Sequence, residues 1–442
     1  MRKSANRAVV RPLAVLIGMS ILLVACGGGE DDGSATEEAT DTPSATDQVV
    51  TVWQFGSPQP EREYYLDRLA EFEDETGIRV ENEMFDWDDR HQQVSLAHGG
   101  DNLPDVLVIE NSMLAELSNE EVIVPVTDLT ADAPDRVDAW AEHYVPSLWE
   151  LGSYEGEFYG FSPYADLSPN LIYNTEMLAE AGIEPPQTWS ELLEAAAALT
   201  TDDRYGIAFG STATLDTDIF ESIAYMNGAR WLDPESGEPT LSDAGWVDAM
   251  AFVEELSVHA QPGITDQNFR DALQLFYAEQ AAMVISKSFA PIIAQDYDVS
   301  PDFPDAMASF PRPDSPSGAF EPVDSVGQAA LLFVPTRSVQ DAEAVMDFLE
   351  FWAQPEQHVG WDGSEIMGRV PTAWDVIRSD TWAEQYPALA AELDVAFESV
   401  EPLPVFPGHS PAQEQLTQAI QGVLIGSVTP EEALDSVEAE LR

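Results

Sequence analysis

Carboxylate and amide side chains lie at positions where they could act on a small polar molecule. Glu110 and Asn111 follow a strongly apolar run, and Asp166 lies two residues after Tyr164 in a second extended run. Glu110 and Asp166 could serve as the acid and the nucleophile of a glycosidase, which needs two carboxyl groups beside the bond it cleaves. The chain holds 81 Asp and Glu residues, so such pairs also arise by chance. Hydrogen bonding to a bound solute is the second interpretation, and both stay open on these residues alone.

Sequence signatures of other catalysts are absent from the chain. It holds no Gly-x-Ser-x-Gly segment, no phosphate-binding loop and no His-Glu-x-x-His segment. His91 and His98 are seven residues apart on a predicted helix, and no third ligand is expected beside them. We therefore predict no catalytic residue, no cofactor and no metal site of this kind, although the many Asp residues leave calcium binding open.

Aromatic side chains accompany the polar ones. Trp53 and Phe55 end a predicted strand, where the alternation of side chains places both on the same side, and Trp87 lies in a turn between two Asp residues. A sugar presents hydroxyl groups at its edges and C–H groups on its faces, so it needs aromatic rings beside fixed donors and acceptors. This combination of residues therefore suits a carbohydrate site.

Each candidate also has an ordinary structural alternative. Core packing would explain Trp53 and Phe55, and a solvated loop would explain Glu110 and Asn111. A hinge-stabilising hydrogen bond would explain Tyr164 and Asp166.

The elements that position these residues alternate between strand and helix. Strands are predicted over 49–55, 78–85 and 103–109, with helices over 61–76 and 92–98 between them. This order is typical of a parallel α/β sheet, in which ligands bind beyond the carboxyl ends of the strands. The later expectations are a hairpin-like pair over 154–173, helices over 189–199, 219–226, 245–258 and 339–352, strands over 205–209, 282–285 and 328–334, and a surface excursion over 296–322.

The N-terminal segment has the pattern of an export signal. Four basic residues precede an apolar stretch, 13–25, that is too short to span a bilayer, and the chain's one cysteine, Cys26, follows it. Leu23 to Cys26 resembles a bacterial lipobox, which predicts lipidation of Cys26. Residues 27–48 hold no aromatic residue and cannot form a core, so we expect an acidic tether with a reach of about 25 Å.

The charge of the chain excludes one class of partner. The formal net charge is −63, and removal of the four basic residues of the signal would take it to about −67. Such a chain repels polyanions, so we expect no nucleic-acid partner. Lysine occurs only as Lys3 and Lys287, and this acidic, lysine-poor composition predicts a surface adapted to salt-rich, halophile-like surroundings.

Several fragments, taken in order, resemble the extracellular solute-binding proteins of family 1, the maltose-binding-protein-like lipoproteins that feed sugar ABC importers. The resemblance covers nearly the whole mature chain. The fragments are LPDVLVIEN, GEFYGFSPYADLSPNLIYN, PPQTWSELLEAAAALT, FYAEQAAMVISKSFA, DAEAVMDFLEFWAQPEQ and GRVPT. Val326-Gly327 stands where the family usually has two glycines, and Phe289 where a tryptophan is common.

The resemblance implies a two-lobed α/β fold of the type II periplasmic-binding-protein kind, with a hinge and a ligand cleft between the lobes. The expected parts are the signal peptide (1–25), the lipidated tether (26–48), lobe 1 (49–165), lobe 2 (166–305), a return to lobe 1 (306–352) and a C-terminal helical segment that packs mainly on lobe 2 (353–442). It also adds Phe289, and Arg369 of the last fragment, to the ligand-binding candidates.

The function that the resemblance implies is capture of a sugar or oligosaccharide and its delivery to ABC permease subunits. A monomer held outside the cytoplasm by lipidated Cys26 is expected, with a secreted carbohydrate-active enzyme as the alternative. The sequence does not specify the sugar.

Overall fold

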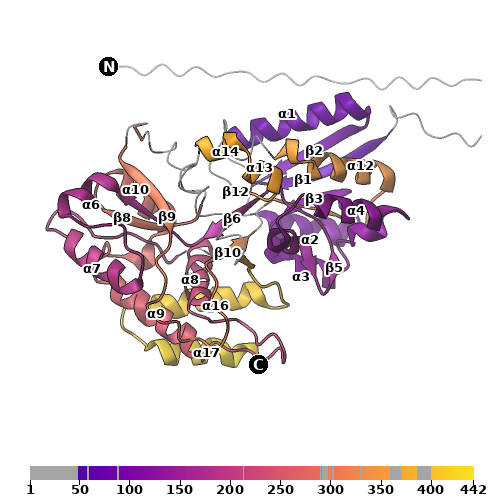
Figure 1. The fold of residues 1–442 in the computed structure, drawn as a ribbon. Helices are drawn as coiled ribbons and strands as arrows, with labels where there is room; N and C mark the ends of the chain where they lie inside the picture. The colour runs from indigo at the N-terminus through magenta and orange to yellow at the C-terminus, as the bar shows by residue number, and fades with distance from the viewer. Residues whose placement is uncertain are drawn as a thin grey trace, which may run out of the picture. The chain divides into compact units, whose positions relative to one another are not determined.

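A computed structural model describes residues 48–56, 59–86, 89–212, 214–288, 290, 297, 299–300, 303–328, 331–358, 370–385 and 400–442. These described residues belong to one compact unit. Three sheets of three or four strands and a short two-stranded ribbon organise the described part (Figure 1). No described helix is both long and apolar enough to cross a membrane.

The first sheet is the predicted parallel one. Its strand order is β11-β3-β1-β2, in which β1 pairs parallel with β2 and β3, and β11 is antiparallel to β3. Its elements are β1 (Val49–Phe55), α1 (Gln59–Thr76), β2 (Arg79–Phe85), α2 (Arg90–Gly100), β3 (Val106–Ile109), η3 (Asn111–Met113), α3 (Leu114–Asn119), η4 (Val126–Asp128), α4 (Ala133–Ala141), β11 (Leu332–Pro335), α12 (Ala342–Ala353) and η8 (Pro355–Gln357).

Alternating side chains of this sheet pack into two apolar clusters. Val50 and Val52 of β1 pack on one side, with the inner faces of α1 and α12. There the ring of Trp352 stacks on Tyr65, with 5.2 Å between ring centroids, and on Phe333, with 5.0 Å. Phe55 of β1 packs on the other side, with α2 and α3. The period of two in the sequence therefore sets which residues face which helices.

The second sheet is formed by strands from widely separated parts of the chain. Its order is β12-β6-β10-β13, with β6 antiparallel to both β10 and β12, and β13 parallel to β10. The elements here are α5 (Pro146–Trp149), η5 (Glu150–Gly152), β4 (Ser153–Tyr154), β5 (Glu157–Phe158), β6 (Tyr164–Ser168), β10 (Ser325–Gln328), β12 (Val370–Pro371), α13 (Trp374–Ile377), α14 (Asp380–Gln385) and β13 (Val400–Pro402).

The third sheet, β8-β7-β9, is antiparallel and has apolar clusters on both faces. Helices α8, α9, α16 and α17 contribute to one cluster and α10 to the other. The elements are β7 (Asn170–Asn174), α6 (Thr175–Ala181), α7 (Trp189–Leu199), α8 (Thr214–Met226), α9 (Ala244–Ser257), η6 (Ile264–Asp266), α10 (Phe269–Tyr277), β8 (Met283–Ser286), β9 (Asp305–Ser309), α16 (His409–Leu424) and α17 (Pro430–Leu441).

The C-terminal part of the chain contributes to two different clusters. Ile377 and Trp382 pack in the cluster that holds Phe55 of β1, whereas Leu416 of α16 and Leu434 of α17 pack with α8 and α9. In Figure 1, α16 and α17 lie beside α8 and α9, and α13 and α14 lie near β12.

Four expectations about local structure were wrong or incomplete. The two runs over 154–173 do not form a hairpin, because β6 pairs with β10 and β12 while β7 pairs with β8 and β9. The strand expected over 328–334 is two strands, β10 and β11, which belong to different sheets. The excursion over 296–322 contains the paired strand β9, and residues 205–209 make only isolated bridges, one to β8 and one to Ala281, two residues before it.

The start of α7 has part of a capping box. The Thr188 side chain accepts a hydrogen bond from the backbone N–H of Glu191 at 3.3 Å. The Glu191 carboxylate accepts from the backbone N–H of Gln187, at 2.8 Å. The reciprocal bond of a capping box is therefore displaced by one residue.

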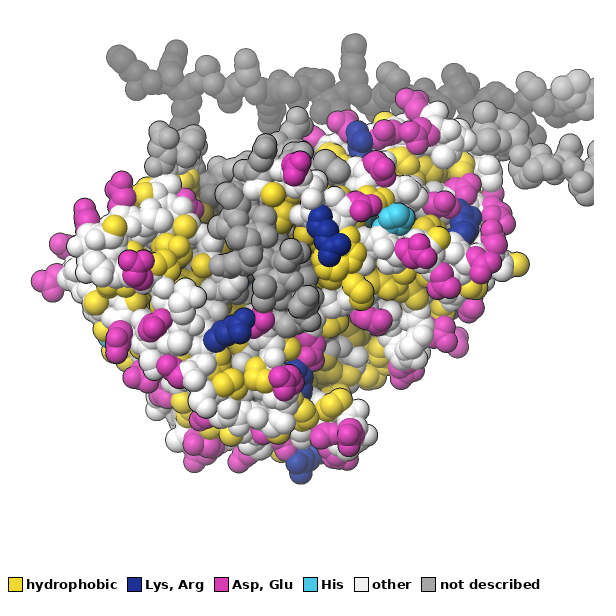
Figure 2. Space-filling model, in the orientation of Figure 1, with side chains coloured by type: hydrophobic (Ala, Val, Ile, Leu, Met, Phe, Trp, Pro, Cys, Tyr) yellow, Lys and Arg dark blue, Asp and Glu magenta, His cyan; other side chains and the backbone are white. Residues whose placement is uncertain are grey.

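Acidic side chains are spread across the described surface of the face seen in Figure 2, and Lys and Arg side chains are few there. This agrees with the net charge of −63.

A buried histidine makes stability depend on pH. His358 is fully buried, with Nε2 3.1 Å from the Tyr144 hydroxyl oxygen and 3.2 Å from the Trp352 carbonyl oxygen. Burial lowers its pKa from 6.5 to about 3. Between these values the unfolded chain binds a proton that the folded chain does not, so this group reduces stability as pH falls below 6.5.

We therefore expect the natural chain to lose more unfolding free energy than His358→Gln when the pH falls from 7 to 4.5. The extra loss should be about 2 to 3 kcal/mol. Urea unfolding at both pH values measures it. His91→Gln, at a side chain that is 43% exposed, is the control and should shift far less. Equal shifts in the two variants would contradict the assignment to His358.

Candidate functional site

Two aromatic candidates lie near the carboxyl edge of the first sheet. Parallel pairing aligns Phe55 with Phe85, so β1 and β2 end at the same edge. The Phe85 ring stacks on Phe55 at 5.6 Å and meets Trp53 edge-on at 4.8 Å, between centroids. Phe55 is fully buried and Trp53 is half-buried. The burial of Phe55 favours its core-packing alternative, whereas Trp53 keeps part of its ring accessible.

Glu110 and Asn111 follow β3 at the same edge. Glu110 Oε1 accepts a hydrogen bond from Nε of Arg90 at 2.9 Å and forms an ion pair with Nη2 of the same guanidinium at 2.9 Å. The two side chains are only 12% and 16% exposed, so the ion pair is largely withdrawn from water. Asn111 is buried. The end of β3 is therefore a packed polar site, not the solvated loop of the alternative interpretation.

Tyr164 and Asp166 lie in β6, every residue of which is buried. Ala165 and Leu167 pack in the same cluster as Phe55 and Ile109. Alternation places Tyr164 and Asp166 on the opposite face of β6, where the Tyr164 ring joins the cluster of α1 and α12. The structure thus places Trp53 and Phe55 with one apolar cluster and Tyr164 with another, so packing does not bring these two groups of candidates together.

Four candidates lie outside the described residues: Cys26, Trp87, Phe289 and Arg369. Their roles stay predictions.

A buried polar network that the sequence analysis missed lies beside β6. Lys287 follows β8, is 2% exposed, and donates to Asp218 Oδ2 at 2.8 Å and to Gln328 Oε1 at 2.7 Å. Gln413 Nε2 in turn donates to Asp218 Oδ1 at 2.8 Å and to Glu221 Oε1 at 2.9 Å. The signal that could have found it is the position of one of the chain's two lysines directly after a buried strand.

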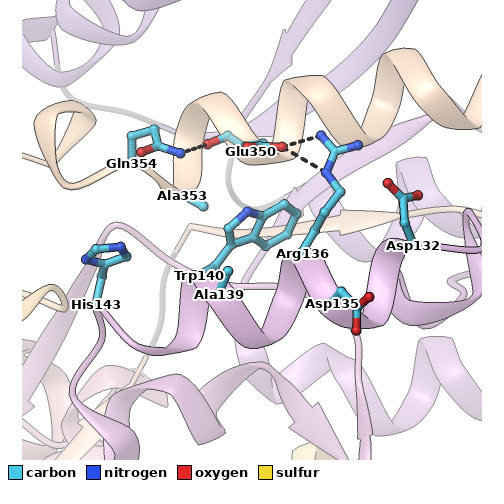
Figure 3. Close-up of a pocket in the computed structure, with 9 residues that line it drawn as sticks. All are labelled: Asp132, Asp135, Arg136, Ala139, Trp140, His143, Glu350, Ala353 and Gln354. Carbon is cyan, nitrogen blue, oxygen red and sulfur yellow. Dashed lines mark hydrogen bonds and ion pairs between the residues drawn. The ribbon is translucent and has the colours of Figure 1, made fainter.

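Two hollows of the described surface lie elsewhere. One, of about 320 Å³, lies between α4 and α12 (Figure 3). The Arg136 guanidinium there is held by Glu350 and, at 3.0 Å, by Asp347. Another, of about 590 Å³, lies near Gln48 and Asp105. Neither contains a predicted site residue, and no cluster of three or more metal-ligating side chains occurs in the described part.

Comparison with known proteins identifies the family. The family model described as "Bacterial extracellular solute-binding protein" matches residues 56–359, which is more than half of the chain. The chain belongs to this family. Among solved structures, maltose-bound MalE3 of T. maritima has a TM-score of 0.74 at 20% identity, over 89% of this chain and 98% of that one. The Thermotoga lettingae solute-binding protein bound with α-D-tagatose has a TM-score of 0.73 at 21% identity, over 89% and 99%.

Relatives found by sequence comparison are also solute-binding proteins. The sn-glycerol-3-phosphate-binding periplasmic protein UgpB of Escherichia coli is 22% identical over 76% of this chain and 78% of its own length. The diacetylchitobiose-binding protein DasA of Streptomyces coelicolor is 27% identical over 40% of this chain and 39% of its own. The chain is thus a solute-binding protein with the two-lobed α/β fold, and its family and neighbours are binding proteins, not enzymes.

The Arg90–Glu110 ion pair provides a stability test at this site. Arg90→Met would leave a carboxylate in a largely water-excluded position, so we expect a loss of about 2 kcal/mol of unfolding free energy. Arg79→Met is the matched control, because its pair with Glu81 is 62% and 57% exposed and should be worth less than about 1 kcal/mol. Urea denaturation compares them, and equal losses would show that Glu110 is as solvated as Glu81.

Proposed function

We propose that this chain is the substrate-binding lipoprotein of an ABC importer, which captures a sugar or oligosaccharide in the cleft between its lobes and delivers it to the permease. The observation that carries the proposal is the family match over residues 56–359. Solved neighbours named for bound maltose and tagatose favour a sugar over other solutes.

The proposed ligand-binding set combines aromatic rings with hydrogen-bonding groups. It comprises Trp53, Phe55, Trp87, Glu110, Asn111, Tyr164, Asp166, Phe289 and Arg369. The half-buried Trp53 is the stronger of the two β1 candidates, since Phe55 is enclosed on all sides. Rings would stack on sugar C–H faces while the carboxylates and amides take the hydroxyl groups.

We propose the expected division into lobe 1 (49–165 and 306–352), lobe 2 (166–305) and residues 353–442 mainly on lobe 2, with one change. We place the return to lobe 1 after Gly318, because β9 pairs with β7 and the Gly318 N–H donates to the Asn227 carbonyl oxygen. Antiparallel pairing of β6 with β10 supports a hinge at these crossings. A solute that touches both lobes only when they are closed would favour the closed population by its differential affinity. Binding and release then require no covalent step, so we propose no enzymatic activity, and a monomer suffices.

Capture of a sugar predicts stabilisation by the right ligand. In a thermal-shift panel of maltose, maltotriose, tagatose, ribitol, acarbose, diacetylchitobiose and glycerol 3-phosphate, we expect at least one sugar or polyol to raise the melting temperature. A ligand at one hundred times its Kd adds about 2.7 kcal/mol to the unfolding free energy. Chromatography of the recovered sugar checks for products. No shift with any compound, or turnover of one, would contradict the proposal, and turnover would favour the carbohydrate-active enzyme.

Membrane anchoring is the second part of the proposal. Residues 1–25 act as the signal peptide, and lipidated Cys26 holds the mature protein at the outer face of a membrane through the tether. We expect Cys26→Ser to move the exported protein from the membrane fraction to the soluble fraction and to abolish incorporation of labelled fatty acid. A membrane-bound Cys26→Ser protein would rule out this anchor.

The proposal also includes an acidic surface adapted to salt-rich surroundings, which full stability at very low ionic strength would contradict.

A further inference from the structure

Lys287 is the one lysine among the described residues, and it is buried. Arg supplies nearly all the remaining positive charge of the chain, and most described Arg side chains lie at or near the surface. A lysine ammonium is a compact donor that never accepts a hydrogen bond, unlike the wide, planar guanidinium. A sequence that otherwise avoids lysine keeps one in its interior, where this compact donor is required.

The ammonium fixes how the side-chain amide of Gln328 is turned. Lys287 Nζ lies 2.7 Å from Gln328 Oε1 and 2.8 Å from Asp218 Oδ2. Because an ammonium only donates, the amide must present its oxygen to Lys287 and direct its nitrogen away. In the described part of the chain no acceptor takes the two N–H groups of this nitrogen. Gln328 is 8% exposed, against 2% for Lys287, so it retains slight access to solvent.

Gln328 lies beside a proposed ligand-binding residue. It is the last residue of β10 and is directly opposite Asp166 of β6, so the two side chains emerge on the same face of the sheet. The residue after Lys287 is tied to β6 as well. Ser288 N–H donates to the Leu167 carbonyl oxygen at 3.0 Å, and Leu167 N–H donates to Ser288 Oγ at 3.0 Å. Lys287 is thereby held in place relative to both strands.

We propose that Gln328 is a solute-contacting residue and that Lys287, held by Asp218, is the positioning residue that turns the Gln328 amide nitrogen toward the solute. This inference rests on the proposed function and names the group recognised. Gln328 supplies an N–H donor and Asp166 a carboxylate acceptor on one face, which suits two neighbouring hydroxyl groups of a sugar, one accepting and one donating. The charge of Lys287 is balanced by Asp218, so the ammonium adds no net attraction for an anionic solute.

Gln328→Glu tests the contact. The new carboxylate can still accept from Lys287, so the fold should be kept, but the N–H donors are lost. With maltose as the probe, or with the panel sugar that replaces it if maltose gives no shift, we expect calorimetric affinity to fall at least tenfold. The matched control is Gln340→Glu, which adds the same charge at an exposed residue and should bind as the natural chain does.

The outcomes separate this inference from the function on which it rests. If the natural chain binds a panel sugar and Gln328→Glu binds it equally well, the inference is wrong and the function stands. If the natural chain binds none of them, both are rejected.

The positioning role is tested by removing the ion pair as a pair. Lys287→Met with Asp218→Asn leaves no lone buried charge, so the double variant is expected to fold. In the natural background, the double substitution should reduce the affinity for the sugar. When Gln328 is already Glu, the same double substitution should reduce the affinity little further, because Lys287 acts through the Gln328 amide. Equal losses in both backgrounds would mean that Lys287 acts by another route. If the double variant does not fold, the Gln328→Glu result decides whether the contact exists.

Discussion

The antiparallel pairing of β6 with β10 is the interaction on which the arrangement of the site depends. It places Gln328 opposite Asp166 and Val326 opposite Ser168. On one face of this pair, Ala165 and Leu167 pack with the first sheet; on the other face, Val326 packs in the cluster of α8 and α9. A single two-stranded contact thus joins segments that are 157 or more residues apart in the chain to both main cores. A one-residue slip would turn every one of these side chains to the opposite face.

Charge is handled differently inside the protein and on its surface. Carboxylates cover the surface without matching cations, and salt screens their mutual repulsion. The described buried carboxylates near the site have defined donors instead: Arg90 for Glu110, and Lys287 and Gln413 for Asp218. The few cations of this chain therefore have a large effect where water is excluded, because an unpaired buried charge is costly.

Local periodicity in the sequence was enough to predict much of the fold. The first strand was predicted over 49–55 and is observed over Val49–Phe55, and the parallel pairing of the first three strands was also correct. Local periodicity could not predict which strands pair with each other. Nothing in a run of extended residues states that β6 and β7, separated by one proline, enter different sheets, because pairing is set by strands far away in the chain. The same holds for β10 and β11, which looked like one apolar strand.

The site was predicted less completely than the fold. Strand ends could be located from apolar runs, and these gave Trp53, Glu110 and Asn111 near one edge of the first sheet. Lys287 was noticed only as a rarity of composition, since its partners, Asp218 and Gln328, are 69 and 41 residues away. Burial was also not readable from residue type, as the enclosed Phe55 and the accessible Trp53 have the same pattern.

The distribution of indole rings has a spectroscopic consequence. Trp231, Trp246, Trp352 and Trp382 are enclosed in apolar clusters with at most 1% of their surface exposed. Their fluorescence emission is that of indole rings shielded from water, and solute binding should change it little. It therefore forms a constant background in the fluorescence of the intact chain. The indoles of Trp53, Trp149 and Trp374 are only partly buried, so quenching by a water-soluble agent would report on these rings and not on the enclosed four.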